Sequence, residues 1–303
     1  MADRQGTSPH AGLHSSLEGG DVLIVNPHSP LADDDGGTSS PYVTIQAALN
    51  DIGEPQSEAD QKRRFTVIIA PGVYDQSLQI AAGRRITLLC EGPVTIGDGA
   101  ADSDFVSTTP RNITVDCTPA FGGRATLTIS PAVSAQLYGA RCTQTTAFDI
   151  SGDLVLVGDP TAALVAAVRL YTVRIRGNLD GTGLTAIGVD MHLKGTRVDG
   201  TLNGPNIGII DAFHCAFQGL VSVLVFVHAL ACSIEAGLTV VGPPSTAGSD
   251  VLPGGMYSCR FSGTFTGPSS SAWTDAATNY WFKTNGASLA GGASKTILGD
   301  LTP

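Results

Sequence analysis

The stretch that decides the fold runs from residue 173 to residue 210 and reads VRIRGNLDGTGLTAIGVDMHLKGTRVDGTLNGPNIGII. It repeats one pattern, in which a short run of β-branched and apolar residues ends in glycine, aspartate or asparagine. Glycines that close such runs recur along the chain at Gly152, Gly177, Gly200, Gly219, Gly237 and Gly263. Their gaps are 25, 23, 19, 18 and 26 residues. These gaps are too long for a hairpin and too short for a βαβ unit.

A period near twenty residues is typical of one coil of a parallel β-solenoid, in which three short strands are joined by turns of variable length. With strands about 4.8 Å apart, roughly nine or ten coils would form a rod about 45 Å long. An antiparallel sandwich is the alternative, but its hairpins require stronger two-residue turn signals. The sequence therefore predicts an all-β, single-stranded parallel β-helix.

One amphipathic helix is expected near residues 44–52, immediately before the strands. Four apolar residues fall at i, i+3, i+4 and i+7 and share one helical face: Ile45, Ala48, Leu49 and Ile52. Gly53 follows them as a stop signal. Because the first coil of a solenoid exposes an open sheet edge, we expect this helix to cap it.

Three regions are predicted from the change in composition along the chain. Residues 1–40 are rich in glycine, serine, aspartate and proline and are expected to form a flexible N-terminal arm or anchor. Residues 41–267 are expected to form the β-helix body. Residues 268–303 are expected to form a C-terminal cap or oligomerisation tail.

Composition excludes several classes of protein. The chain of 303 residues is 42% hydrophobic and only 15% charged, which excludes disorder as its main state. Its net charge of −10 argues against a nucleic-acid partner. The longest apolar run, Leu220 to Cys232, has 13 residues and is too short to span a bilayer. The polar N-terminus predicts synthesis in the cytoplasm without a signal peptide.

No cofactor is expected, because the sequence has no phosphate-binding loop or dinucleotide fingerprint. The six cysteines are spread singly, without the spacing of a usual zinc site, and are expected to be buried free thiols. The acidic triplet Asp33, Asp34 and Asp35 is a weak calcium candidate, and a solvated turn is the favoured interpretation.

The start of the predicted body resembles that of the pectin-lyase-like right-handed β-helix proteins. The resemblance is carried by TIQAAL at Thr44–Leu49 and by PGVY at Pro71–Tyr74, within about residues 41–80. That group includes pectinesterases and many viral or phage spike proteins. The resemblance implies a right-handed β-helix, but it says little about chemistry, because enzymes and inert members share this capping device.

The catalytic motifs of the pectin-lyase-like enzymes do not follow this opening. The segment closest to a pectinesterase motif, Ala147–Gly152, is a poor match. No family catalytic residue can therefore be assigned to this chain.

If the protein is nevertheless an enzyme, its weak catalytic candidates come from spacing alone: Asp190, Asp211, His192 and His214. Residues one coil apart stack in a solenoid, so the two aspartates could approach as an acid–base pair and the two histidines could stack. Turn aspartates and core or surface histidines are the favoured interpretation.

Four aromatic residues gather within ten positions near the C-terminus: Trp273, Tyr280, Trp281 and Phe282. Aromatic side chains in such a tail can cap the last coil or contact a neighbouring subunit. A carbohydrate-stacking platform is the other interpretation, under which surface glycans are the expected partner.

These observations favour a non-enzymatic structural or attachment protein on the surface of a virion or other particle. Continuous apolar runs predict faces that are buried between subunits, and we expect a homotrimer. The N-terminal arm would contact other particle or capsid proteins. A polysaccharide-acting enzyme (a lyase, hydrolase or esterase with a divergent site) and a glycan-binding module are the alternatives.

Overall fold

The computed structural model describes residues 21–29, 40–97, 110–121, 125–132, 147–160, 166–223 and 226–240, together with five short strands beyond residue 254. Almost all of its regular elements are strands, and every strand pairing in the described residues is parallel. The prediction of an all-β fold with parallel strands is thus confirmed. The antiparallel sandwich is excluded.

The strands form three parallel sheets, which we call A, B and C. Sheet A contains, in spatial order, β1 (Asp21–Val25), β2 (Arg64–Ile69), β5 (Arg85–Cys90), β8 (Thr126–Pro131), β11 (Ala166–Tyr171), β14 (Val189–Lys194), β17 (Ile207–Phe213), β20 (Phe226–Leu230), β23 (Gly255–Tyr257) and β26 (Trp281–Phe282). Sheet B contains β3 (Gly72–Tyr74), β6 (Val94–Ile96), β9 (Phe148–Ile150), β12 (Val173–Ile175), β15 (Arg197–Val198), β18 (Ala216–Phe217), β21 (Ser233–Ile234) and β24 (Arg260–Phe261). Sheet C contains β4 (Leu78–Ile80), β7 (Ile113–Asp116), β10 (Leu154–Gly158), β13 (Leu179–Leu184), β16 (Leu202–Gly204), β19 (Val221–Val223), β22 (Gly237–Val240), β25 (Thr264–Thr266) and β27 (Ser288–Ala290).

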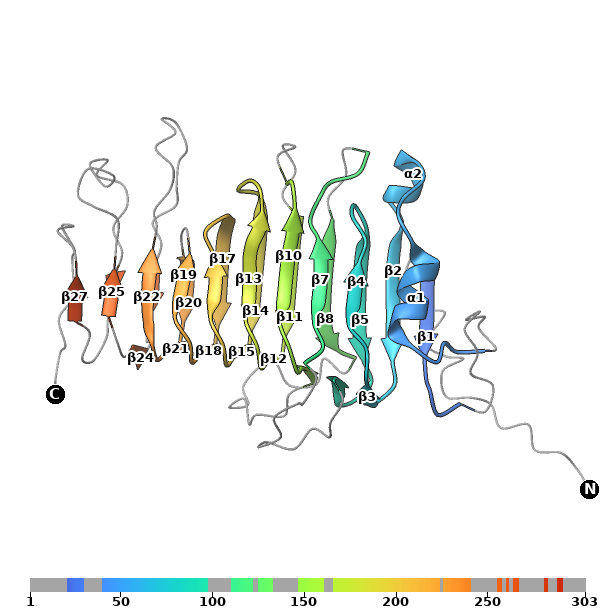
Figure 1. Cartoon of the computed structure of the whole chain (residues 1–303), viewed down its shortest axis with the longest axis horizontal. Coiled ribbons are helices and arrows are strands. Elements are labelled where there is room, and N and C mark those ends of the chain that lie inside the picture. The colour runs from blue at the N-terminus through green and yellow to red at the C-terminus, as the bar shows by residue number, and fades with distance from the viewer. Residues whose placement is uncertain are drawn as a thin grey trace, which may run out of the picture.

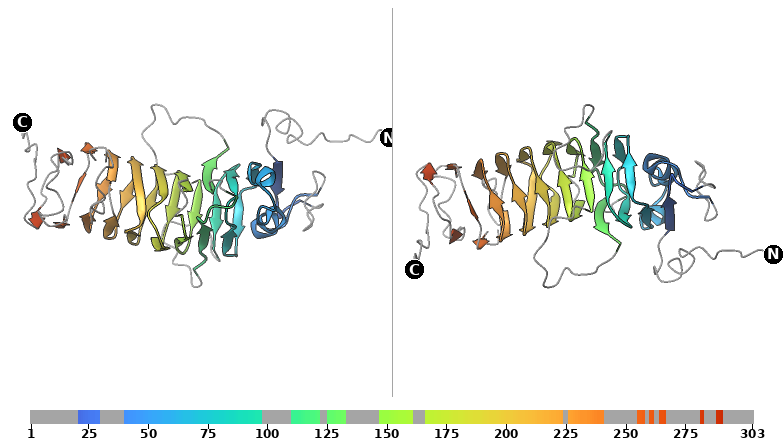
Figure 2. Two further views of the ribbon diagram at one scale, coloured as in Figure 1. Left: turned by 90° about the horizontal axis from the view of Figure 1, so that it is seen from above. Right: turned by 90° about the horizontal axis from the view of Figure 1, so that it is seen from below.

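From β2 to β25 the chain visits sheets A, B and C in that order, and each such set of three strands is called a round here. The described residues contain eight complete rounds, with β1 before them and β26 and β27 after them. Figure 1 shows the rounds following one another along the long axis of the molecule, and Figure 2 shows the same stack from two other sides.

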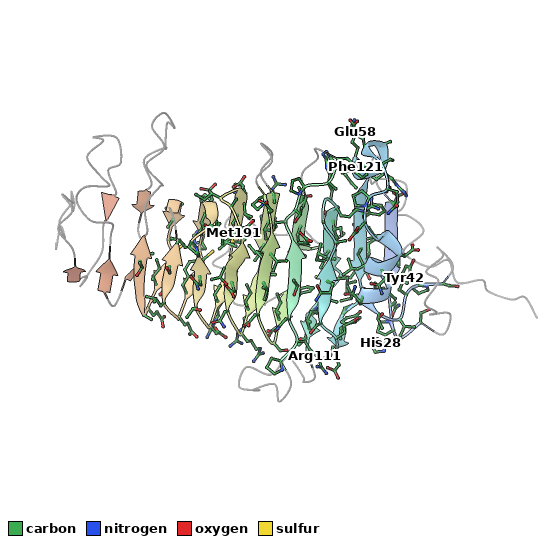
Figure 3. All side chains as sticks on the ribbon, turned by 45° about the horizontal axis from the view of Figure 1, so that its top comes forward. His28, Tyr42, Glu58, Arg111, Phe121 and Met191 are labelled. Carbon is green, nitrogen blue, oxygen red and sulfur yellow. The ribbon has the colours of Figure 1, made fainter. Side chains whose placement is uncertain are left out.

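Alternation along each strand sends one set of side chains into a shared core. On β14, for example, Val189, Met191 and Leu193 are buried, and Met191 lies midway along the described rounds in Figure 3. The intervening side chains of β14 lie on the outward face of sheet A. Buried apolar side chains from all three sheets form one continuous cluster.

Four of the recurring glycines lie at the corner between sheets B and C: Gly152, Gly177, Gly200 and Gly219. The amide of Gly177 donates to the carbonyl of Gly152, Gly200 donates to Gly177, and Gly219 donates to Gly200. A Cβ on Gly200 would lie only 2.5 Å from the Gly177 carbonyl oxygen. Glycine recurs at this spacing because the backbones of successive rounds approach too closely at the corner for a Cβ atom.

Helix α1 (Ile45–Ile52) lies at the N-terminal end of the stack, beside β1 and β2 (Figure 1). It buries the four residues that share its apolar face: Ile45, Ala48, Leu49 and Ile52. The Gln46 side chain accepts a hydrogen bond of 2.8 Å from the backbone N–H of Gln79, on the edge strand β4 of sheet C. The helix therefore satisfies an edge that would otherwise be open.

Arg84 fastens α1 and the short helix α2 (Glu58–Gln61) to the first rounds. Its guanidinium donates to the backbone carbonyls of Ile52, Gly53 and Glu54 at the end of α1. It also donates to the carboxylate of Asp60 on α2, at 2.9 Å. The side chain is only 3% exposed, so these acceptors replace the water that a buried guanidinium loses.

Described strands also lie in the two terminal regions on either side of the predicted β-helix body. Strand β1 lies within residues 1–40, which were assigned to an arm, and it pairs in register with β2 over five residues. Its apolar sequence, DVLIV, extends sheet A by one strand. Strands β26 and β27 lie within residues 268–303, so part of the predicted tail continues sheets A and C.

Candidate functional site

Three of the four catalytic candidates lie together on the outward face of sheet A. His192 on β14 places Nδ1 3.2 Å from Asp211 Oδ2, on the neighbouring strand β17. Its other ring nitrogen, Nε2, lies 3.2 Å from Asp190 Oδ1 and 3.3 Å from Asp190 Oδ2. We call Asp190, His192 and Asp211 the Asp–His–Asp cluster.

A β-bulge puts Asp211 on this face. Val189 pairs with Ile207, but the next residue, Asp190, pairs with Ile209, so that β17 contains one extra residue at Gly208. Strict alternation from the buried Ile207 would have turned Asp211 inward. The extra residue reverses the alternation, buries Ile210 and opposes Asp211 to His192.

The contacts within the cluster are incomplete. A carboxylate only accepts hydrogen bonds, and a neutral imidazole has a single N–H, so one neutral ring cannot donate to both aspartates. Asp190 Oδ1 is within ion-pair distance of the ring but makes no hydrogen bond, although the atom itself is buried. The side chains of His192 and Asp190 are about a third exposed, at 34% and 30%. The cluster thus offers two carboxylates at a surface that solvent reaches.

The fourth candidate, His214, does not join the cluster. The 22-residue spacing predicted that it would stack on His192, but the register partner of His192 is Asp211. His214 follows the end of β17 at an exposed corner, in a left-handed conformation with φ of 54°. Its backbone N–H donates to Leu230 in the next round. That stacking prediction is wrong, because the corner interrupts the strand before His214.

The remaining candidates give less information. The acidic triplet Asp33–Asp35, Trp273 and Tyr280 lie outside the described residues. Trp281 and Phe282 form β26, whose backbone pairs with β23. Within the described ranges, no group of three or more histidine, cysteine, aspartate or glutamate side chains is arranged to hold a metal ion. No helix in those ranges is long and apolar enough to cross a membrane.

A second charged cluster, which the sequence analysis did not identify, lies on the outward side of sheet B. Arg176 donates from Nε and Nη2 to both oxygens of Asp149, at 2.8 to 3.2 Å. Arg174 donates from Nε to Asp199 at 2.8 Å, and Arg197 binds the same carboxylate. Hydrogen bonding to Asp149 raises the pKa of Arg176. We call these five residues the arginine–aspartate cluster.

The cysteines agree with the expected buried free thiols in the part of the chain that is described. Cys90, Cys117, Cys215 and Cys232 are free and buried. Burial raises the pKa of both the Cys90 and the Cys117 thiol to about 12. Such thiols are poor nucleophiles at neutral pH.

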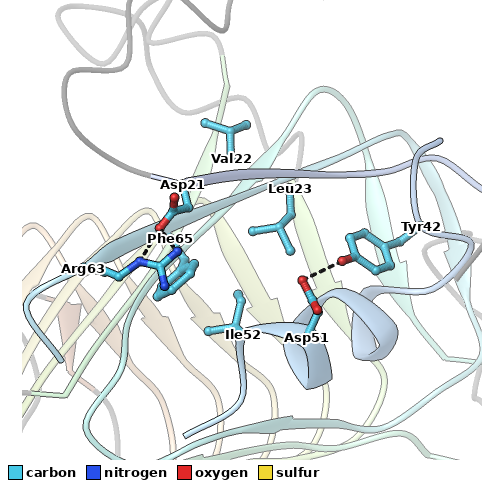
Figure 4. Close-up of a pocket in the computed structure, with 8 residues that line it drawn as sticks. All are labelled: Asp21, Val22, Leu23, Tyr42, Asp51, Ile52, Arg63 and Phe65. Atoms are coloured by element: carbon cyan, nitrogen blue, oxygen red, sulfur yellow. Dashed lines mark hydrogen bonds and ion pairs between the residues drawn. The ribbon is translucent and has the colours of Figure 1, made fainter. Parts of the chain in front are cut away.

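A pocket of about 430 Å³ opens between β1, β2 and α1 at the N-terminal end (Figure 4). Its polar groups already pair with each other. The Tyr42 hydroxyl donates to Asp51 at 2.8 Å, and Arg63 contacts Asp21 at 2.7 Å. The lining therefore acts as part of the cap and leaves no unpaired group for a ligand among the side chains that Figure 4 draws.

Comparison with protein-family models, with curated proteins and with solved structures finds no match for this chain. The resemblance to pectin-lyase-like proteins thus remains a prediction from residues 41–80.

Proposed function

We propose that this chain is a right-handed, single-stranded parallel β-helix of about nine to ten coils that serves as a structural or attachment protein on the surface of a virion or other particle. Eight complete rounds in three parallel sheets support the coil arrangement. The right hand is supported by the strong preference of parallel crossover connections for that hand. In this proposal the segment before β1 contacts other particle proteins.

The proposal of a homotrimer rests on a largely apolar row of side chains on the outward face of sheet A. Tyr171, Lys194, Phe213 and Leu230 oppose one another across β11, β14, β17 and β20. Three of these four residues are apolar or aromatic, and Leu230 is 38% exposed. Solvent-accessible apolar side chains that lie next to one another, as Phe213 and Leu230 do, are typical of interaction sites in soluble proteins. Rods packed side by side would bury the row along their length.

Light scattering of the purified full chain tests the assembly. We expect the mass of a trimer for the wild type and the mass of a folded monomer for the double variant Phe213→Glu/Leu230→Glu, because two charges enter the contact. Asn203→Glu, on the outward face of sheet C, is the matched control and should remain trimeric. A monomeric wild-type protein, or a double variant that stays trimeric, contradicts the proposal.

The Asp–His–Asp cluster supports one second candidate, a polysaccharide-acting enzyme. Two carboxylates on one accessible face are the groups that glycoside hydrolysis uses, and Asp190 Oδ1 has no hydrogen bond within the protein. A panel of polysaccharides incubated with wild-type protein and with Asp190→Asn tests this candidate. Cleavage by the wild type alone supports it, and equal product with both proteins, or none with either, counts against it.

A further inference from the structure

Five basic residues lie at or just before the start of β2 and β5, which are the sheet A strands of the first two rounds. Three precede or begin β2 and two precede or begin β5: Lys62, Arg63, Arg64, Arg84 and Arg85. Because β2 and β5 are neighbours, the two groups lie together at the same end of the sheet. This concentration of positive charge stands out in a chain whose net charge is −10.

Three of the five cations are neutralised within the cap. Lys62 Nζ lies 2.7 Å from Glu58, and Arg63 lies 2.7 Å from Asp21. Arg84 binds Asp60 at 2.9 Å. Three nearby carboxylates thus account for three of the five positive charges.

Arg64 and Arg85 are the two that remain. They face each other directly in the β2–β5 register, and like charges in that position repel. The Arg85 Nε is buried and has no hydrogen-bond partner. Arg64 is exposed, and neither residue forms an ion pair in the part of the chain that the structure describes. A buried N–H without an acceptor is unfavourable, and an acceptor bound beside the two guanidinium groups would relieve that cost.

We propose that Arg64 and Arg85 form a binding site for a phosphate or sulfate group. Guanidinium groups present their N–H donors in a planar fork that suits such oxyanions. Neighbouring strands are about 4.8 Å apart, so one tetrahedral anion can contact both side chains. Bound there, it would accept hydrogen bonds from the guanidinium groups of Arg64 and Arg85 and reduce the repulsion between them. Thr126, the register partner of Arg85 on β8, is the nearest further hydroxyl donor along the same line.

Equilibrium dialysis of the full chain with radiolabelled phosphate or sulfate, at constant ionic strength in chloride, tests the site. We expect saturable binding of one anion per chain. Arg85→Gln and Arg64→Gln should each weaken binding at least tenfold. Arg64→Gln changes an exposed side chain, so it keeps the test valid if Arg85→Gln does not fold. Lys62→Gln, which removes one positive charge from the same cluster, is the matched control and should change binding less than twofold.

Two results would overturn the proposal: no saturable binding by the wild-type protein, or equal weakening by Lys62→Gln and both arginine variants. The second result would show general attraction to positive charge. A sulfated oligosaccharide in a parallel dialysis identifies the source of the anion. Binding more than tenfold tighter than that of inorganic sulfate assigns the site to a sulfated glycan, and equal binding assigns it to the free ion.

Discussion

The outward faces of sheets A and B carry charged clusters on neighbouring rounds, but the two clusters are built differently. On sheet B, arginine supplies the positive charge, and Arg176 alone gives Asp149 two donor nitrogens. On sheet A, Asp190 and Asp211 share one imidazole, and one oxygen of Asp190 has no hydrogen bond. The aspartates of sheet B are also less accessible than Asp190.

The two clusters therefore differ in what their charges can do: the cluster on sheet B can stabilise the fold, whereas stability does not explain the cluster on sheet A. A guanidinium carries five N–H donors and stays charged, so it can satisfy both oxygens of a carboxylate at once. An imidazole carries one N–H on each nitrogen at most. We therefore expect the arginine–aspartate cluster to stabilise the fold and the Asp–His–Asp cluster to contribute little.

The largest effect is expected for Asp149→Ala on sheet B. Asp149 is only 6% exposed, and its loss removes the carboxylate that accepts from both Nε and Nη2 of Arg176. Breaking a buried pair from one side costs about 3 kcal/mol in the free energy of unfolding, which urea denaturation measures. The double variant Asp149→Ala/Arg176→Met should recover part of the loss, because it also removes the guanidinium whose carboxylate partner is lost. A loss below about 1 kcal/mol would place this pair with ordinary surface ion pairs.

A smaller effect is expected for Asp199→Asn. Asp199 accepts from both Arg174 and Arg197, and its side chain is 16% exposed. The amide keeps one acceptor oxygen but loses the charge, so we expect a loss of about 1 kcal/mol. The same denaturation experiment measures it. No loss would show that Asp199 is held only by solvent-screened contacts.

Acid should weaken the contact between Arg84 and a third aspartate, Asp60 in the cap. Its hydrogen bond from Arg84 is the main cause that lowers its pKa from 3.8 to about 2. A lowered pKa stabilises the folded protein above the unfolded value, and this stability is lost as the pH falls from about 4 to about 2. Urea midpoints measured across that range should fall more steeply for the wild type than for Asp60→Asn. Parallel curves would contradict the coupling of Asp60 to folding.

The parts of the molecule that local sequence determines could be predicted. The short apolar runs fixed strand positions, and the i, i+3, i+4, i+7 pattern located α1 because helical burial depends on residues close in the chain. The partners within the clusters could not be predicted. Arg176 and Asp149 are 27 residues apart, and such a distance identifies partners only when the length of every turn is known. The bulge at Gly208 places Asp211 opposite His192, whereas the spacing in the sequence predicted that Asp211 would approach Asp190.

The smallest effect is expected for His192→Gln. Its size shows whether the Asp–His–Asp cluster stabilises the fold as the arginine–aspartate cluster does. The side chain is 34% exposed, and glutamine retains one N–H donor group for one of the two aspartates. Exposed polar substitutions of this kind usually change the free energy of unfolding by less than about 0.5 kcal/mol. Urea denaturation beside Asp149→Ala gives the contrast directly. A loss close to that of Asp149→Ala would show that the imidazole holds sheet A as arginine holds sheet B, and the cluster would need no function beyond stability. A negligible loss leaves two carboxylates and a histidine that a bulge assembles at the surface without benefit to the fold, and it directs the search for carbohydrate chemistry to this face.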